Sequence, residues 1–174
     1  HLIFADDRGI IYKINNNGKL SWKKNIYKKI YKNIYKNLVL SIYKNQLFIA
    51  DNVGFIYSIN LDNGELIWIK NYGIPLRSNI KVFEDKIFLI DQNNRILSLS
   101  VKDGTKIWDI LTISSFIKSQ TLLSLAISAK GDLIVLNSSA DPYRINSRNG
   151  DVYWTSNTLS SLLTDATDFF ISSQ

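Results

Sequence analysis

The chain has 174 residues, of which 45% are hydrophobic and 21% charged, and its formal net charge is +6. This composition can fill a folded core and excludes an intrinsically disordered chain. The absence of cysteine excludes a disulfide, a thiol nucleophile and a Cys-ligated metal within these residues. No apolar run approaches the roughly 20 residues that span a bilayer. No methionine begins the chain, whose first residue is His1, so we expect it to be part of something longer.

Short stretches rich in β-branched and aromatic residues recur along the chain, separated by turn-forming residues, and this pattern is typical of β-strands. In chain order, the predicted strands include residues 2–5, 10–14, 38–43, 47–50, 55–59, 80–83, 87–90, 96–99, 122–127, 133–136, 143–145 and 168–172. Asn-Gly and Asp-Gly pairs between them supply the positive φ that tight hairpins need. We therefore expect mostly antiparallel strands.

Four tryptophans recur 46, 40 and 46 residues apart, and each follows a glycine by four positions. Asn or Asp precedes every one of these glycines, so a unit of the form [N/D]-G-x-x-x-W occurs four times. The four pairs are Gly18 and Trp22, Gly64 and Trp68, Gly104 and Trp108, and Gly150 and Trp154.

A repeat of about 40–45 residues that carries four short strands predicts the blade of a β-propeller. We predict an all-β fold with four-stranded antiparallel blades in a single domain over residues 1–174. One blade cannot bury both of its faces, so neighbouring blades must stack. The glycines and tryptophans are predicted to dock one blade on the next. The units are predicted at about 1–25, 38–70, 80–110 and 120–156, with a final strand at 168–172.

The stretch from Tyr57 to Trp68 resembles the tryptophan-docking repeat of the PQQ-type β-propellers, whose pattern is roughly Y-A-L-D-x-x-T-G-x-x-x-W. Two further stretches, 97–108 and 143–154, match at the same spacing, and 12–22 is one residue shorter. The resemblance covers nearly the whole chain. The sequence departs from the family pattern at its Ala position, which is occupied by Lys13, Ser58, Ser98 and Arg144.

The number of blades in the ring is left open by the sequence, because the first unit lacks its first strand. In one interpretation, strand 168–172 fills that place and closes a four-bladed ring. In the favoured one, the chain is about half of a seven- or eight-bladed ring, the usual size in the family it resembles. A half ring exposes two apolar blade faces, so we expect two copies to associate as a homodimer.

No catalytic, cofactor-binding or metal-binding residue is predicted. The PQQ-dependent dehydrogenases of this fold hold PQQ and calcium, so a fragment of such an enzyme is an alternative whose cofactor residues would lie in other blades. Asp6, Asp51 and Asp91 recur once per repeat, which indicates capping of a turn rather than catalysis.

Seven lysines and no acidic residue lie between residues 23 and 44. Their alternation with tyrosines suggests a second alternative, a surface that binds nucleic acid or anionic membrane. The candidate anion-binding residues are Lys28, Lys29, Lys32 and Lys36. The competing interpretation, which we favour, is a lysine-rich surface loop or short helix, with nucleic acid an unlikely partner.

Residues 72–79 look like the inter-blade loop with which propellers of the BamB type contact their partner in outer-membrane protein assembly. Leu76 and Arg77 hold the matching positions, although we favour an ordinary connection in which Leu76 packs between blades. The resemblance implies a non-enzymatic scaffold that binds protein, takes no small-molecule substrate and lies in the periplasm, associated with the outer membrane.

Overall fold

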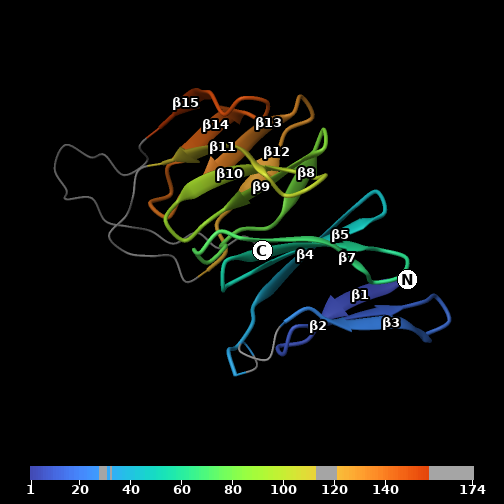
Figure 1. The fold of residues 1–174 in the computed structure, drawn as a ribbon. Helices are drawn as coiled ribbons and strands as arrows, with labels where there is room; N and C mark the ends of the chain where they lie inside the picture. Colours follow the sequence, from blue (N-terminus) through green and yellow to red (C-terminus); the bar gives the residue numbers. More distant parts are fainter. Residues whose placement is uncertain (28–30, 32, 113–120, 157–174) are drawn as a thin grey trace.

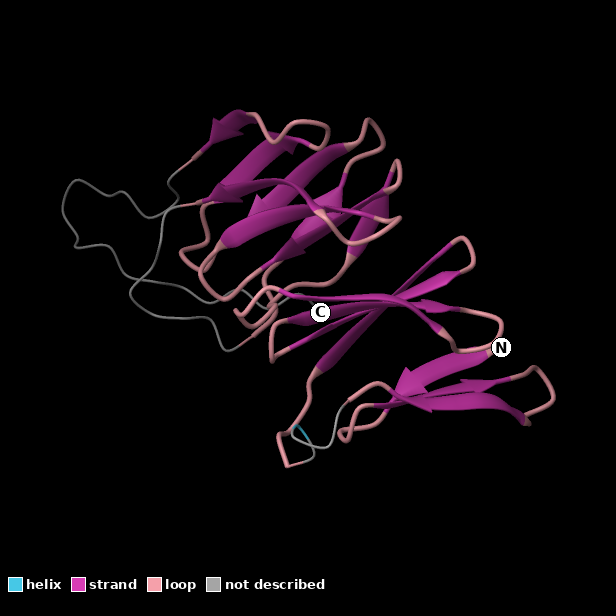
Figure 2. Cartoon of the chain, viewed as in Figure 1, coloured by secondary structure: helices cyan, strands magenta, loops and turns pink. Residues whose placement is uncertain are grey.

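The computed structural model describes the chain except for residues 28–30, 32, 113–120 and 157–174. The described residues form fifteen strands in four separate antiparallel sheets. Figures 1 and 2 show the sheets side by side in a fan, with the first and fourth at its two ends. The predicted all-β propeller fold is confirmed.

The four sheets follow one another along the chain. The first contains β1 (Leu2–Ala5), β2 (Ile10–Ile14) and β3 (Leu20–Asn25), and the second β4 (Leu38–Tyr43), β5 (Gln46–Asp51), β6 (Phe55–Asn60) and β7 (Leu66–Asn71). The third contains β8 (Lys81–Phe83), β9 (Lys86–Ile90), β10 (Arg95–Ser100) and β11 (Lys106–Leu111). The fourth contains β12 (Leu125–Ile127), β13 (Asp132–Leu136), β14 (Pro142–Asn146) and β15 (Val152–Thr155).

Each sheet is a simple meander in which every strand pairs with its neighbour in sequence. A bulge interrupts the last strand pair of all four sheets at the same place, for example between Ser58 and Ile59. The bulge puts each tryptophan opposite the residue that replaces the Ala of the family pattern. Trp68, for example, lies opposite Ser58. The repeat in sequence is thus a repeat in hydrogen-bond register.

The core lies between the sheets, in three clusters. The inner strands are apolar at consecutive positions because both of their faces are covered. In β5, Leu47 and Ile49 pack toward the first sheet, whereas Phe48 and Ala50 pack toward the third. Side chains alternate between the two faces of a strand, so neighbouring residues pack in different joints, where a joint is the contact region between two adjacent sheets.

The first sheet has three strands in the described part of the chain, where the others have four. The strand predicted at 168–172, which would complete it in a closed four-bladed ring, lies outside the described residues.

Candidate functional site

The sites repeated in this fold are the joints between adjacent sheets, and each joint is built around a tryptophan. The indole N–H of Trp22 donates to the carbonyl oxygen of Leu61 at 3.1 Å, across the boundary to the next sheet. Trp68 donates to Val101 at 3.0 Å and Trp108 to Ser147 at 3.2 Å in the same way. Each of these three tryptophans therefore docks on the turn before the last strand of the following sheet.

The glycine of each motif makes room for the tryptophan of the preceding sheet. A Cβ atom on Gly64 would lie 2.9 Å from the Trp22 ring, and one on Gly104 would lie 2.6 Å from Trp68. Gly150 meets Trp108 at 3.0 Å. All three glycines also have positive φ, so a side chain would be strained in its backbone as well as crowded.

The first glycine and the last tryptophan of the series, Gly18 and Trp154, have no such contact among the described residues. A Cβ on Gly18 would have no neighbour within 4 Å. Trp154 is 45% exposed, whereas Trp68 is 9% exposed. The docking role is thus visible for three tryptophans and three glycines, and for Gly18 and Trp154 it stays a prediction.

The recurring aspartates cap turns. One carboxylate oxygen of Asp51 accepts hydrogen bonds of 2.7–2.9 Å from the backbone N–H groups of residues 53–55. Asp6 and Asp91 make the same kind of contact in their own sheets. Asn137 takes this place in the fourth sheet, where its side-chain oxygen accepts from the N–H groups of Ser139 and Asp141.

The joint between the first and second sheets holds a group of aromatic rings. Tyr27 contacts Tyr57 edge to face with ring centroids 5.8 Å apart, and its hydroxyl donates to the second oxygen of Asp51. Tyr31 and Phe55 complete the group at 5.4 Å. Burial, reinforced by the bond to Asp51, raises the pKa of Tyr27 well above its usual range. This role of Tyr27 is not predictable from the sequence, because no residue near it along the chain indicates a bond to a turn in another sheet.

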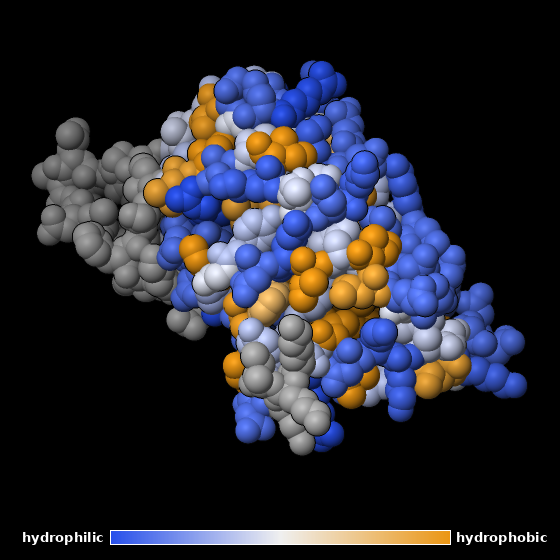
Figure 3. Space-filling model, viewed as in Figure 1, coloured by the Kyte–Doolittle hydropathy of each residue, from blue (hydrophilic) through white to orange (hydrophobic). Residues whose placement is uncertain are grey.

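An apolar pocket of about 420 Å³ opens beside this group and is lined partly by β7. Leu66, Ile67 and Ile69 of that strand are exposed. In Figure 3, hydrophobic residues reach the surface in the middle of the viewed face, where Figure 1 draws the second sheet.

The structure places one of the four candidate anion-binding lysines in the interior. Lys36 is 3% exposed, its ammonium group donates to the carbonyl of Tyr31, and it lies over the Tyr27 ring at 5.1 Å from the centroid. An anion outside the protein cannot reach it in this conformation, so Lys36 corrects the expectation of a surface lysine. Lys28, Lys29 and Lys32 lie outside the described residues.

The candidate partner-binding residues of the connection between the second and third sheets differ in exposure. Leu76 is 4% exposed and belongs to the core cluster between those sheets, so the interpretation in which it packs between blades is confirmed. Arg77 is partly exposed. The connection is held by backbone bonds, from the N–H of Leu76 to Asp51 and from the N–H of Arg77 to Ile90.

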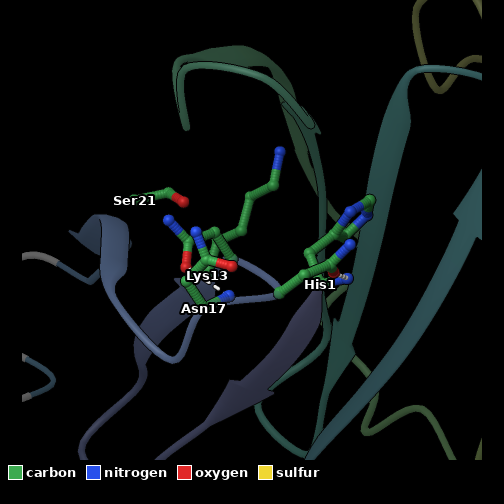
Figure 4. A pocket seen from close by; sticks show the side chains of 6 residues that line it. His1, Lys13, Asn17 and Ser21 are labelled. Atoms are coloured by element: carbon green, nitrogen blue, oxygen red, sulfur yellow. Dashed lines mark hydrogen bonds between the residues drawn. The ribbon is translucent and has the colours of Figure 1, made fainter.

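A second recess, of about 430 Å³, opens at the turn that carries Gly18 and is drawn in Figure 4. Its lining is polar and contains no carboxylate: His1, Lys13, Asn15, Asn16, Asn17 and Ser21. The ammonium group of Lys13 donates to the carbonyl of Leu61 at 2.8 Å. This cation of the recess is therefore already engaged by an oxygen atom of the protein.

Among the described residues, no three His, Cys, Asp or Glu side chains gather in a way that could hold a metal ion. That same part of the chain contains no helix of the length and apolarity needed to cross a bilayer.

Comparison with known proteins gives matches at the levels of family and fold. The family model described as outer membrane protein assembly factor BamB matches residues 7–168. A curated relative, the outer membrane protein assembly factor BamB of Salmonella typhimurium (strain LT2), is 30% identical over 97 residues. These are 56% of this chain and 23% of that protein, so the match spans about a quarter of the relative's length.

Solved structures share the fold at lower identity. BamB from Moraxella catarrhalis has a TM-score of 0.70 at 15% identity, over 89% of this chain and 44% of that one. Quinohemoprotein alcohol dehydrogenase from Comamonas testosteroni has a TM-score of 0.68 at 11% identity, over 89% and 33%. The quinohemoprotein alcohol dehydrogenase ADHIIG from Pseudomonas putida HK5 has a TM-score of 0.71 at 10% identity, over 91% and 33%. At these identities the similarity shows the fold alone.

Proposed function

Since the chain belongs to the family of the outer membrane protein assembly factor BamB, we propose that it is a non-enzymatic scaffold that binds protein during outer-membrane protein assembly. The observation that carries this proposal is the family match over residues 7–168, which includes all four tryptophan motifs. The proposal extends to location, and we place the protein in the periplasm in association with the outer membrane. The partner is expected to be another component of that assembly process.

The physical basis of a scaffold is a surface whose shape is fixed before binding, because ordering a flexible loop on binding costs affinity. The connection between β7 and β8 has this property. Its backbone bonds to Asp51 of the second sheet and to Ile90 of the third, and the N–H of Gln92 donates to Pro75 at 2.8 Å. The N–H of Leu123 in turn donates to the carbonyl of Arg77. Residues of the second sheet, of the third sheet and of the segment that precedes the fourth thus hold one short connection.

Within this connection we assign the partner contact to Arg77, because Leu76 is buried in the core. The guanidinium group offers several donors in a fixed plane, and arginine is enriched among the residues that dominate binding energy at interfaces. The Arg77 side chain is partly exposed, and its backbone N–H donates to the carbonyl of Ile90, the residue before Asp91. Leu76 would contribute indirectly, by fixing the backbone from which Arg77 projects.

The experiment is complementation in a Salmonella strain that lacks its own BamB, with the chain exported to the periplasm. We expect the chain to raise the amount of outer-membrane β-barrel protein, and Arg77→Glu to lower this gain. A photo-reactive residue at position 77 should cross-link to a component of outer-membrane protein assembly. Lys102→Glu is the matched control, because Lys102 is exposed at the opposite rim, on the turn before β11. It should leave both readouts unchanged.

Failure of a folded, exported chain to raise barrel-protein levels, together with no cross-link to the assembly components, would overturn the proposal. The enzyme alternative has its own measurement. A fragment that holds PQQ and calcium should melt at a higher temperature when both are added, and for a scaffold we expect no shift.

A further inference from the structure

Asparagine followed by glycine begins three of the four tryptophan motifs, as Asn17-Gly18, Asn63-Gly64 and Asn149-Gly150. This pair is chemically reactive, because the backbone nitrogen that follows an asparagine can attack the side-chain amide carbon, and glycine has no Cβ to hinder the approach. All three asparagines are exposed, although a tryptophan of the preceding sheet covers Gly64 and Gly150. Exposure therefore belongs to the turn itself, and water reaches the three amides alike.

Two of the three amides are held by hydrogen bonds within their own turn. The side-chain nitrogen of Asn63 donates to a carboxylate oxygen of Glu65 at 2.9 Å, and its side-chain oxygen accepts from the backbone N–H of Glu65 at 3.0 Å. Asn149 makes the same two contacts with Asp151, at 2.6 and 3.1 Å. The neighbouring carboxylate also opposes the negative charge that develops on the attacking nitrogen and on the amide oxygen. Both the position and the charge of the acidic residue therefore protect the amide.

The turn of Asn17 lacks both protections. Its loop is one residue shorter, and the residue two positions after the asparagine is Lys19 instead of an acid. The backbone N–H of Lys19 donates to the side-chain oxygen of Asn15 at 2.9 Å, and this oxygen also accepts from the N–H of Asn17 at 3.0 Å. The N–H group that holds the amide oxygen in the other two turns is thus already used, and the Asn17 amide bonds no residue in the described part of the chain. The ammonium group of Lys19 favours the developing negative charge instead of opposing it.

We propose that Asn17 is a site of spontaneous deamidation, at which the folded chain modifies itself. The nitrogen of Gly18 forms a bond to the side-chain carbonyl carbon of Asn17, the bond from that carbon to the amide nitrogen breaks, and ammonia leaves with the proton of the Gly18 N–H. Water then opens the cyclic imide at either carbonyl and gives aspartate or isoaspartate. The only co-reactant is water. This inference is independent of the proposed function, because it rests on the geometry of the turns alone.

The third motif indicates which product the fold accommodates. Asp103 occupies the position of Asn17, and its carboxylate accepts from the backbone N–H of Thr105 at 3.1 Å and from its hydroxyl at 2.8 Å. An aspartate therefore fits this turn. Isoaspartate instead routes the backbone through the side-chain carbon, which lengthens the path from the turn to Trp22. We expect it to displace the Trp22 indole from the carbonyl of Leu61, to which it donates at 3.1 Å.

Peptide mapping by mass spectrometry tests the inference on the full folded chain, held at mildly alkaline pH and sampled over time. We expect Asn17 to be converted at least about tenfold faster than Asn63 and Asn149, since a hydrogen bond to a charged group is worth that factor. An isoaspartyl methyltransferase is the probe for the isoaspartate product. Chains incubated in urea give the reference, in which the three rates should approach one another because the turns are lost.

Two single substitutions change the local environments in opposite directions. Glu65→Ala removes the acceptor from Asn63, so Asn63 should be converted about tenfold faster in this variant, with Asn17 unchanged. Lys19→Glu supplies a carboxylate two residues after Asn17 and should slow its conversion. Both substituted residues are exposed in their turns, and circular dichroism checks that each variant folds. Asn149 is the internal control, and its rate should be the same in both variants as in the wild type.

Conversion of Asn63 or Asn149 at the rate of Asn17 in the folded wild type would overturn the inference. It would equally be overturned if Asn17 stayed intact in the folded chain while it is converted in urea. A Glu65→Ala variant in which Asn63 remains as slow as in the wild type would remove the protecting role of the carboxylate, and with it the basis of the inference.

Discussion

Trp68 and Trp154 occupy the same position of the same motif, yet their surroundings differ completely. Trp68 is buried between the second and third sheets, packs against Phe48 with tilted rings whose centroids are 5.9 Å apart, and donates to the carbonyl of Val101. Trp154 lies on β15, of which every residue is exposed. The comparison shows that the motif specifies a side chain ready to dock, and that the following sheet supplies the energy of docking.

The same contrast holds for the glycines. Gly104 faces the Trp68 ring, whereas Gly18 faces open space with nearly the same φ, +68° against +75°. At the ends of the fan, Gly18 and Trp154 keep the local sequence of the motif, but no neighbouring sheet covers them among the described residues. They therefore serve as an internal reference for the buried joints.

The largest expected effect is that of removing the buried indole. Trp68→Ala should lower the free energy of unfolding by about 3–5 kcal/mol, because it leaves a cavity in the core and an unpaired carbonyl at Val101. Trp154→Ala should cost less than about 0.5 kcal/mol when measured by urea unfolding at a concentration at which the chain is monomeric. Equal losses at the two positions would contradict the assignment of docking energy to the joint.

The glycine pair separates crowding from backbone strain. Gly18→Ala should destabilise by about 1 kcal/mol, the cost of positive φ for a residue with a Cβ. Gly104→Ala carries the same strain and adds a clash with Trp68, so we expect a total of about 2–4 kcal/mol. Thermal melts of the two variants measure this difference in stability directly. A difference near zero would mean that the Trp68 ring moves aside at no cost in free energy.

The smallest expected effect concerns Tyr72, whose hydroxyl donates to the carbonyl of Gly104 at 2.6 Å in the same joint. Tyr72→Phe should cost about 0.5–1.5 kcal/mol at neutral pH, the usual contribution of one hydrogen bond. Burial, with a smaller contribution from the negative charge of Asp103, raises the pKa of Tyr72 to about 12.

Because the folded protein raises this pKa above the usual value of about 10, the stabilisation is complete below pH 10 and is lost as the pH rises through 12. Unfolding curves at several pH values should show the wild type losing its advantage over Tyr72→Phe across that interval. Tyr153→Phe is the control, since Tyr153 is exposed on β15, and it should track the wild type throughout.

The architecture was open to prediction because it depends on local, repeated signals. Alternating apolar stretches give strands, Asn-Gly and Asp-Gly give turns, and the 40–46-residue period of Trp22, Trp68 and Trp108 shows that the sheets stack. The capping role of Asp51 followed from its recurrence at one structural place, since a residue that every repeat keeps serves the repeat.

The contacts between distant segments could not be predicted in the same way. Tyr27 bonds Asp51 across a joint, and Lys36 lies buried over the Tyr27 ring although it belongs to the most basic stretch of the chain. Leu76 could as well have projected outward to a partner as inward to the core. In each case the sequence near the residue is compatible with either environment, and packing chooses between them.

The sequence by itself determined the strands, the turns and the docking motif, because these depend on a residue's own conformational preferences and on spacing along the chain. Only the tertiary structure decided which tryptophans are docked among the described residues and which lysine is buried. The physical reason is that burial is a property of pairs of surfaces, and a sheet gains the energy of its apolar face only when another sheet covers it.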